Sequence, residues 1–359
     1  MSGSTSTIRV GLIGTGRMGQ HHLNAIKASQ LGTVVGVADP AASPEEMAPL
    51  LPDGAIVVSS AAELLERTKP DVVHIVTPPG THAALALQAI DAGCHVYVEK
   101  PFTPTAAEAE EIVARAAARG VKVCAGHQVL FEAPALAVHE HLASIGRMVH
   151  IESYFSFKMV RRTITAVDQV KDILPHAIYP VVDQLRLGTG LATEPIEILG
   201  TSLDAAGDCY ALLKLGRVTA VVVVTLNGRP VEQYQNIIAT NGSLRADFIG
   251  GFLGRLVGPG TGPGVLLTPY RRALHTVWGT TRGLTRLIVG GSYPGLRTLV
   301  KRFYESIRDE TPAPMTPQSI VDTVEVCERL GAALDVVEAA YETEARSRLA
   351  PCPFPGCAG

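Results

Sequence analysis

The feature that most constrains this chain is a short apolar run followed at once by a glycine-rich turn, within residues 9–23. Residues 10–13, Val-Gly-Leu-Ile, predict a buried strand. A helix is predicted to open on the six residues that follow: Gly14, Thr15, Gly16, Arg17, Met18 and Gly19. In this context Gly14 permits a tight turn, Gly16 lets a pyrophosphate approach the backbone, and Gly19 lets helix and strand pack closely. The N–H groups at the helix start then face the phosphates, so the sequence predicts a dinucleotide site here.

An acidic residue ends the next predicted strand, residues 33–39, at Asp39. It lies about 20 residues past the last glycine of the fingerprint, where a carboxylate accepts hydrogen bonds from ribose hydroxyls. Such a carboxylate also repels a 2′-phosphate, and residues 40–42, Pro-Ala-Ala, supply no arginine to bind one. We therefore expect NAD as the cofactor in preference to NADP. The alternative is that Asp39 only caps a loop.

The length of the chain bears on the number of domains. Because 359 residues exceed the size of one average core, two domains are expected. We place a dinucleotide-binding Rossmann domain at residues 1–128, a substrate-binding and oligomerisation domain at 129–346, and a disordered tail at 347–359. A hydrophobic fraction of 47% fits a globular protein with large cores, and a net charge of −3 gives no global reason to expect a nucleic acid partner.

Cysteines and apolar runs bear on the compartment and on metals. The six cysteines are scattered, and none forms a pair or a cluster with zinc spacing. We expect reduced thiols in a cytoplasmic protein without a metal site. The first residues are polar and lack the pattern of a signal peptide, and no apolar run has the length of a membrane span.

Polar residues follow the predicted strand 71–77, at the edge where an open parallel sheet binds ligands. They are Thr77, Pro78 and, a few residues later, His82. We expect Thr77 and Pro78 to border the cofactor. For His82 two roles are open, since it either caps the following helix or contacts the cofactor.

The predicted strand 95–99 ends in Glu99 and is followed by Lys100. A lysine at this edge lies over the crevice that holds a nicotinamide, where its ammonium polarises a substrate oxygen and burial lowers its pKa. The alternative is a solvated lysine paired with Glu99. A capping box of Thr105 and Glu108 predicts the next helix, and residues 121–125 close the sheet.

After Gln128 the periodicity changes, which indicates a second domain. Residues 149–157 alternate between apolar and polar, as in a half-exposed antiparallel strand. Asn241-Gly242 is a strong hairpin signal. These patterns predict an α/β domain with a largely antiparallel open sheet. Its further strands are predicted at 195–200, 209–215, 218–226, 234–240 and 243–248, and its helices at 134–144, 175–187 and 316–341.

Five features in one order resemble those of the glucose-fructose oxidoreductase, inositol dehydrogenase and MocA (Gfo/Idh/MocA) family of NAD(P)-dependent oxidoreductases. They are the fingerprint, Asp39, Thr77-Pro78 with His82, Glu99-Lys100-Pro101, and Asp172 with His176. The resemblance covers residues 8–341. It implies an N-terminal Rossmann doubly wound parallel sheet and a C-terminal α/β domain whose open sheet commonly mediates oligomerisation, hence a homo-oligomer, dimer or tetramer.

The resemblance also implies the chemistry, which is reversible hydride transfer between nicotinamide and a secondary alcohol carbon. Lys100 matches the catalytic lysine, and Asp172 and His176 match the pair in the second domain. His176 would exchange the hydroxyl proton, Asp172 would orient the imidazole, and Lys100 would stabilise the developing alkoxide. The cofactor would contact the fingerprint residues, Asp39, Thr77, Pro78, His82, Glu99, Lys100 and Gln128.

One departure from the family pattern bears on the substrate. Many relatives carry an acid three residues after the histidine, where this chain has Tyr179. Its hydroxyl would donate to a sugar oxygen or act as the acid in the reductive direction. We expect a sugar-like or cyclitol-like small molecule, with or without a phosphate. An imine or enone reductase of secondary metabolism and a non-catalytic, cofactor-bound sensor remain as alternatives.

Residues 248–304 form an acid-free stretch that contains no Asp or Glu and the only tryptophan of the chain, Trp278. Such a one-sided composition in a slightly acidic chain suggests an anionic neighbour: a diphosphate, a carrier phosphate or a membrane surface. The alternative is a solvated flap whose arginines pair with acids elsewhere or across a subunit interface. The basic residues are Arg255, Arg271, Arg272, Arg282, Arg286, Arg297, Lys301 and Arg302.

Overall fold

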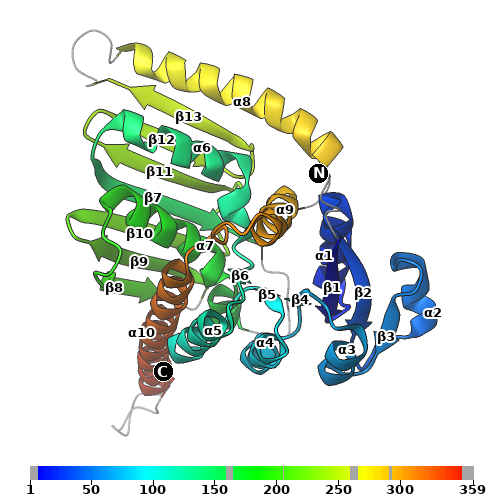
Figure 1. Cartoon of the computed structure of the whole chain (residues 1–359). Coiled ribbons are helices and arrows are strands. Elements are labelled where there is room, and N and C mark those ends of the chain that lie inside the picture. The colour runs from blue at the N-terminus through cyan, green and yellow to red at the C-terminus, as the bar shows by residue number, and fades with distance from the viewer. Residues whose placement is uncertain (1–6, 159–164, 205, 259–265, 291–292, 350–359) are drawn as a thin grey trace, which may run out of the picture.

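The computed structural model describes residues 7–158, 165–204, 206–258, 266–290 and 293–349. In the N-terminal half six parallel strands form one sheet in the order β3-β2-β1-β4-β5-β6, shown in Figure 1. This order is that of a Rossmann fold, and the predicted fold is confirmed. The strands are β1 (Ile8–Ile13), β2 (Gly32–Ala38), β3 (Ile56–Val58), β4 (Val72–Ile75), β5 (His95–Val98) and β6 (Val123–Ala125).

Helices cover both faces of this sheet, as parallel strands buried on both sides require. The capping box predicted at Thr105 and Glu108 is present, and Gly120 ends that helix in the left-handed region with φ 68°. Between β1 and β4 the strand order reverses, which opens a crevice at the carboxyl ends of the two strands. The helices are α1 (Arg17–Ser29), α2 (Pro44–Met47), α3 (Ala61–Thr68), α4 (His82–Asp91) and α5 (Ala106–Arg119).

A second sheet of seven strands has the order β13-β12-β11-β7-β10-β9-β8. The predicted hairpin joins β11 and β12, and Ala239 pairs with Gly242 across a two-residue loop. The expectation for β7 was only half right, because it pairs antiparallel with β11 but parallel with β10. Burial alternation along one strand does not reveal the direction of its neighbours. The strands are β7 (Met148–Ser156), β8 (Glu197–Leu203), β9 (Asp208–Leu215), β10 (Val218–Thr225), β11 (Gln233–Ala239), β12 (Gly242–Asp247) and β13 (Phe252–Val257).

Helices α6 (Ala133–His141), α7 (Ala166–Thr189) and α10 (Pro317–Leu349) contribute to the covering of this sheet. The predicted start of α7 at Pro175 was wrong. The helix begins after Thr165, which forms a capping box with Asp168, and Pro175 and Pro180 both lie inside it. Proline is most common in the first turn of a helix, and this tendency misplaced the boundary.

Helix α9 (Pro294–Arg308) and the start of α10 return to the first domain. Leu299, Phe303 and Tyr304 are buried in the core of the Rossmann sheet, whereas Leu330 and Leu334 of α10 belong to the core of the second sheet. Residues 294–308, although they lie within the range predicted for the second domain, therefore pack on the core of the first. The prediction also lacked β13, α9 and α8 (Thr268–Gly290).

Three expectations concern the surface and the end of the chain. No described helix is long and apolar enough to cross a membrane. Residues 347–349 of the predicted tail belong to α10, and 350–359 lie outside the described residues. The homo-oligomer through the second sheet stays a prediction.

Candidate active site

The glycine turn after β1 has the geometry that the fingerprint requires. Gly14 has φ 96°, and a Cβ there would lie 2.5 Å from the carbonyl oxygen of Val76. A Cβ on Gly19 would lie 2.3 Å from the carbonyl oxygen of Gly14. Any larger residue at either position would push the turn away from the sheet.

The start of α1 leaves room for an anion. Gly16 has no atom within 4 Å of the position of a Cβ, and both Gly16 and Arg17 are exposed, with Thr15 and Met18 half-buried beside them. The helix has neither a side-chain cap nor an acidic residue in its first turn. Its first N–H groups and the positive end of its dipole therefore face this opening, which fits the pyrophosphate of a dinucleotide.

Asp39, at the end of β2, is held by the glycine turn. Its Oδ2 accepts hydrogen bonds from the backbone N–H and the hydroxyl of Thr15, both at 2.8 Å, and its Oδ1 accepts from the N–H of Ala41 at 2.9 Å. Burial raises the pKa of Asp39, but these hydrogen bonds outweigh burial and lower it below its usual value. A carboxylate is thus fixed beside the turn.

The loop after β4 is fastened by His82, which is fully buried. Its Nδ1 lies 2.9 Å from the carbonyl oxygen of Pro101 and its Nε2 lies 2.8 Å from that of Thr77. His82 is the first residue of α4, so it is not the residue that caps this helix. With both ring nitrogens on backbone carbonyls, His82 joins two loops of the crevice, whereas Pro78 is exposed and Thr77 half-buried at its edge.

Glu99 is the buried carboxylate at the end of β5. Its Oε1 accepts from His22 Nε2 and from Gln128 Nε2, both at 3.0 Å, and its Oε2 accepts from the backbone N–H of Lys100 at 3.1 Å. Burial raises the pKa of Glu99, but the hydrogen bond from His22 and the charge of Lys100 outweigh it, and the net shift is downward. Glu99 and Gln128 therefore fix the segments around Lys100.

The hydrogen bonds continue from Glu99 into the core. His22 Nδ1 lies 2.8 Å from His74 Nδ1, and His74 Nε2 lies 2.8 Å from the hydroxyl of Tyr304. An ionised carboxylate only accepts, so His22 Nε2 donates to Glu99. Burial and the neighbouring His22 hold the pKa of His74 well below its usual value, so His74 is neutral. We call these residues, Glu99, His22, His74 and Tyr304, the buried relay.

Lys100 and His176 approach each other across the two domains. Burial and the charge of Lys100 together lower the pKa of His176 to about 3, against the opposing charge of Glu99. The imidazole is therefore neutral near pH 7, the form that a general base must have, although so low a pKa also makes it a weak base. The structure thus brings together a cation from the end of β5 and a neutral base from α7.

The other predicted residues of α7 differ in their surroundings. Asp172 lies one turn before His176 and is exposed. Tyr179 is buried, its ring stacks on His127 at 4.6 Å, and its hydroxyl accepts from the N–H of Val129 at 3.2 Å. Burial raises the pKa of Tyr179, which makes it a poor proton donor. This geometry favours a positioning role for Tyr179 over the role of an acid.

Sequence reasoning missed three ionisable residues at or behind this site. His22 and His74 are fully buried in α1 and β4. For His74 the available signal was its place inside an apolar run, since a buried imidazole requires partners. His22, which follows Gln20 and His21, had no such signal. Burial raises the pKa of the third residue, Glu132, to about 7, so it titrates near neutrality. Among the described residues no cluster of three or more His, Cys, Asp or Glu could hold a metal.

A model of an oxidoreductase family with an NAD-binding Rossmann fold, Gfo/Idh/MocA, matches residues 8–127. The amino-terminal domain belongs to this family. Among curated relatives of the Gfo/Idh/MocA domain, UDP-N-acetylglucosamine 3-dehydrogenase of Acidithiobacillus ferrooxidans is 31% identical over 210 residues, 56% of this chain and 60% of the relative. Inositol 2-dehydrogenase 4 of Saccharopolyspora erythraea is 35% identical over 118 residues, 33% of this chain and 35% of the relative. The chain thus matches no more than 60% of the length of either enzyme.

Solved structures extend the likeness in fold to the second domain. A putative oxidoreductase from Magnetospirillum magnetotacticum has a TM-score of 0.68 at 25% identity, covering 90% of this chain and 99% of that one. The WlbA dehydrogenase from Bordetella pertussis, in complex with NADH and UDP-GlcNAcA, has a TM-score of 0.71 at 18% identity, covering 93% and 96%. Levoglucosan dehydrogenase, in complex with NADH and levoglucosan, has a TM-score of 0.72 at 17% identity, covering 93% and 98%.

The hydrogen bonds of the buried relay predict that removing the hydroxyl groups of two buried tyrosines will have different effects on stability. Tyr304→Phe leaves the buried His74 Nε2 without its hydrogen-bond partner and should lower the free energy of unfolding by about 1–3 kcal/mol. Tyr97→Phe is the matched control, because the Tyr97 hydroxyl is buried without a hydrogen-bond partner among the described residues, and its loss should be neutral or stabilising. Urea unfolding of both variants measures the difference. Equal losses in the two variants would contradict the relay.

The effect of the Lys100 charge on His176 predicts a change in the pKa of His176 that NMR measures. In Lys100→Met the positive charge is lost, so the pKa of His176 should rise from about 3 towards its usual value. A titration of the ring carbons of labelled histidine, with His176→Gln to assign the signal, follows this change. Lys27→Met, which removes an exposed lysine of α1, should leave the signal in place.

Proposed function

We propose that this protein is an NAD-dependent dehydrogenase that acts on a secondary alcohol, or on the ketone in reverse, of a sugar-like or cyclitol-like molecule. The observation that carries the proposal is that Lys100, at the end of β5, lies close enough to His176 for its charge to act on the imidazole. A bound nicotinamide supplies the acceptor or donor of the hydride. The glycine turn would hold its pyrophosphate, and Asp39 its adenosine ribose.

Lys100 and His176 then have complementary roles in the reaction. The neutral imidazole of His176 accepts the hydroxyl proton as the carbon is oxidised and returns it in the reverse direction. The ammonium of Lys100 stabilises the negative charge that develops on the same oxygen. Glu99 and Gln128, fixed by the buried relay, keep the backbone of Lys100 in place, and Tyr179 anchors α7 through its hydrogen bond with Val129.

Two considerations support the substrate class. The relatives with the Gfo/Idh/MocA domain include enzymes named for UDP-N-acetylglucosamine and for inositol, both polyols or their derivatives. One similar structure holds a nucleotide-linked sugar with NADH. A phosphate-bearing sugar is therefore in the proposed class. A non-catalytic sensor would bind the cofactor without turnover, and an imine or enone reductase would turn over only those substrates.

The experiment that tests the activity is a screen for hydride transfer. Purified protein is supplied with NAD or NADP and with sugars, cyclitols, nucleotide-linked sugars and their oxidised forms, and the absorbance of the reduced nicotinamide is followed. Turnover of a polyol or its ketone supports the proposal. Tight cofactor binding without turnover of any such compound would favour the sensor.

On the substrate so found, Lys100→Ala and His176→Ala should each lower kcat by roughly two or more decades and leave cofactor affinity nearly unchanged. The double variant should lose less than the product of the two effects, because both residues act on one oxygen. Lys27→Ala and His150→Ala, at sites away from the crevice, are the controls and should retain activity. Full activity of Lys100→Ala would refute the assignment.

We expect NADH to bind more tightly than NADPH, by roughly 10- to 100-fold, because Asp39 repels the 2′-phosphate with about 1–3 kcal/mol through partly screened solvent. Asp39→Asn keeps an oxygen for the Thr15 N–H but removes the charge, so most of this preference should disappear. Calorimetric titration with both cofactors measures it, with Asp53→Asn as the control at an exposed loop. Tighter binding of NADPH by the wild type would overturn the prediction.

A further inference from the structure

Helix α8 displays its apolar side to solvent. Leu267, Tyr270, Leu274, Val277 and Trp278 recur at spacings of three and four residues, so they share one face. Each is more than half exposed, with Tyr270 and Leu274 at 70% and Trp278 at 63%. An amphipathic helix of a globular protein normally buries this face.

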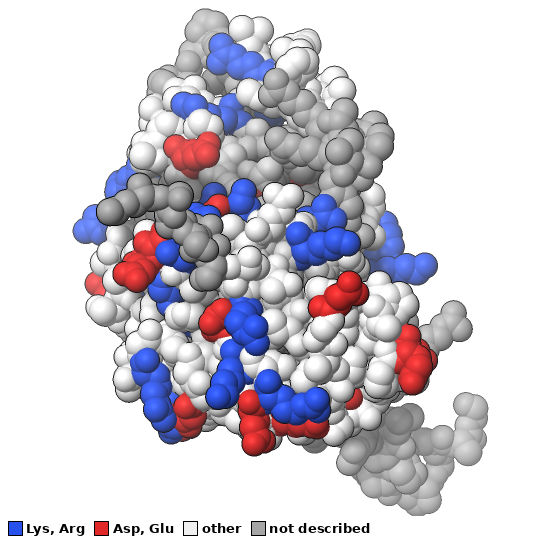
Figure 2. Space-filling model, turned by 45° about the vertical axis from the view of Figure 1, so that its right-hand side comes forward, with Lys and Arg blue, Asp and Glu red and all other residues white. Residues whose placement is uncertain are grey.

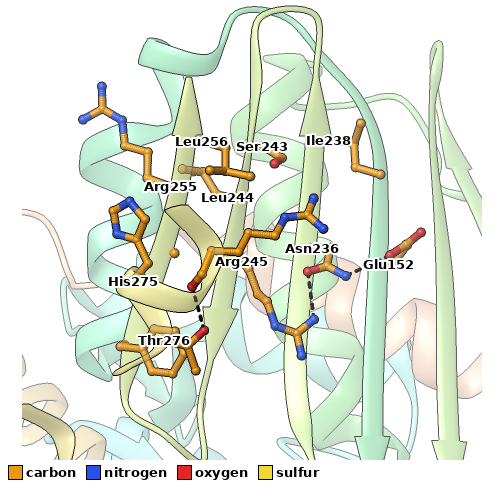
Figure 3. Close-up of a pocket in the computed structure, with 13 residues that line it drawn as sticks. Glu152, Asn236, Ile238, Ser243, Leu244, Arg245, Arg255, Leu256, His275 and Thr276 are labelled. Atoms are coloured by element: carbon orange, nitrogen blue, oxygen red, sulfur yellow. Dashed lines mark hydrogen bonds between the residues drawn. The ribbon is translucent and has the colours of Figure 1, made fainter. Parts of the chain in front are cut away.

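The opposite face of α8 is polar and faces the second sheet. A Cβ on Gly279 would lie 2.5 Å from Phe252 Cβ, so the helix presses on β13 at this point. Beside this contact Arg272, His275 and Thr276 help to line a cavity of about 470 Å³ against the sheet. Figure 3 shows His275 and Thr276 on one side of the cavity, and Asn236 and Glu152 of the sheet on the other. The polar side of the helix is thus directed towards the sheet, although Arg272, His275 and Thr276 stay exposed.

The charged residues of the segment that contains this helix all have one sign. The acid-free stretch, residues 248–304, includes all of α8 and carries eight basic residues. In Figure 2 basic side chains lie in the upper part of the molecule with acidic ones among them, and basic and acidic side chains are interspersed over the lower part. Arg271 is exposed and adjoins the apolar face in sequence, next to Tyr270.

We propose that α8 docks this protein on an anionic lipid membrane, with its apolar face in the boundary between headgroups and acyl chains. A helix with Trp and Leu on one face and basic residues beside it is typical of peripheral membrane proteins. A second copy of the chain fits less well. A two-fold contact through α8 would bring the basic residues of one copy against the same residues of the other.

The position of α8 links the membrane to the cofactor site. The chain continues from α8 to Tyr293, whose ring packs on His21 of α1 at 4.7 Å and whose hydroxyl lies 3.4 Å from an Arg17 nitrogen. Arg17 is the first residue of α1, the helix that opens at the glycine turn. The segment that follows α8 therefore lies against the start of α1. The inference stands on α8 alone and holds whether or not the protein is a dehydrogenase.

Trp278 is the only tryptophan of the chain, so its fluorescence reports on this face in the intact protein. With vesicles of equal parts phosphatidylcholine and phosphatidylglycerol, its emission should shift to shorter wavelength, and the protein should sediment with the vesicles. Phosphatidylcholine vesicles should bind it much less. High salt should weaken binding to the mixed vesicles, because the screening length falls from about 8 Å to about 3 Å at 1 M.

Variants separate the apolar contribution to vesicle binding from the electrostatic one. Tyr270→Ser with Leu274→Ser keeps Trp278 and should weaken partition at least about tenfold, since two exposed apolar side chains lose their burial. Arg271→Gln should weaken it about fivefold. Leu50→Ser with Val336→Ser removes two exposed apolar residues elsewhere and should bind as the wild type does. Hydride transfer to a soluble substrate should be unchanged in all of these variants.

Three results would overturn the proposal. One is the absence of any shift or sedimentation with the mixed vesicles. Another is equal binding to both kinds of vesicle, or equal binding by the wild type and the Tyr270→Ser, Leu274→Ser variant. The third is a shift that grows with protein concentration without lipid, accompanied by a doubled mass in light scattering, which would assign this face to a second copy.

Discussion

The structure around the site depends on one buried negative charge, that of Glu99. A carboxylate removed from water is costly unless donors surround it, and here His22 from α1, Gln128 from the segment after β6 and the N–H of Lys100 all donate to it. These three donors come from different parts of the chain, so the charge fastens α1, β5 and the crossing to the second domain to each other. The position of Lys100 follows from this arrangement.

The same charge bears on the chemistry of the site. Lys100 lowers the pKa of His176 and Glu99 raises it, so the two charges oppose each other at the imidazole. Burial tips the balance towards the neutral ring, which is the form that accepts a proton. His176 lies on a helix of the second domain, so the relative position of the two domains decides how strongly both charges act. A change in the angle between the domains would therefore alter the proton affinity of His176.

Local signals predicted much of this fold, and signals that depend on tertiary pairing did not. Gly14, Gly19 and the capping box at Thr105 were predictable because each has a steric or hydrogen-bonding cause within a few residues. The parallel pairing of β7 with β10 and the return of α9 to the first core depend on distant partners, which no short pattern encodes. The position of Lys100 at the end of a strand suggested its role, and its proposed pairing with His176 came from a resemblance. The buried relay behind them had no sequence signal beyond His74 in an apolar run.

Helix α8, at the surface, illustrates the same limit of prediction from sequence. Its composition predicts a basic, partly apolar segment, but a sequence cannot tell which face of a helix turns towards the rest of the protein. The contact of Gly279 with Phe252 decides this, because only a residue without a side chain lets the helix lie so close to β13 on its polar side. With that side inward, the apolar residues stay in water at a cost that grows with their exposed area. A surface that removes them from water recovers this free energy, and the basic residues nearby give an anionic surface the advantage.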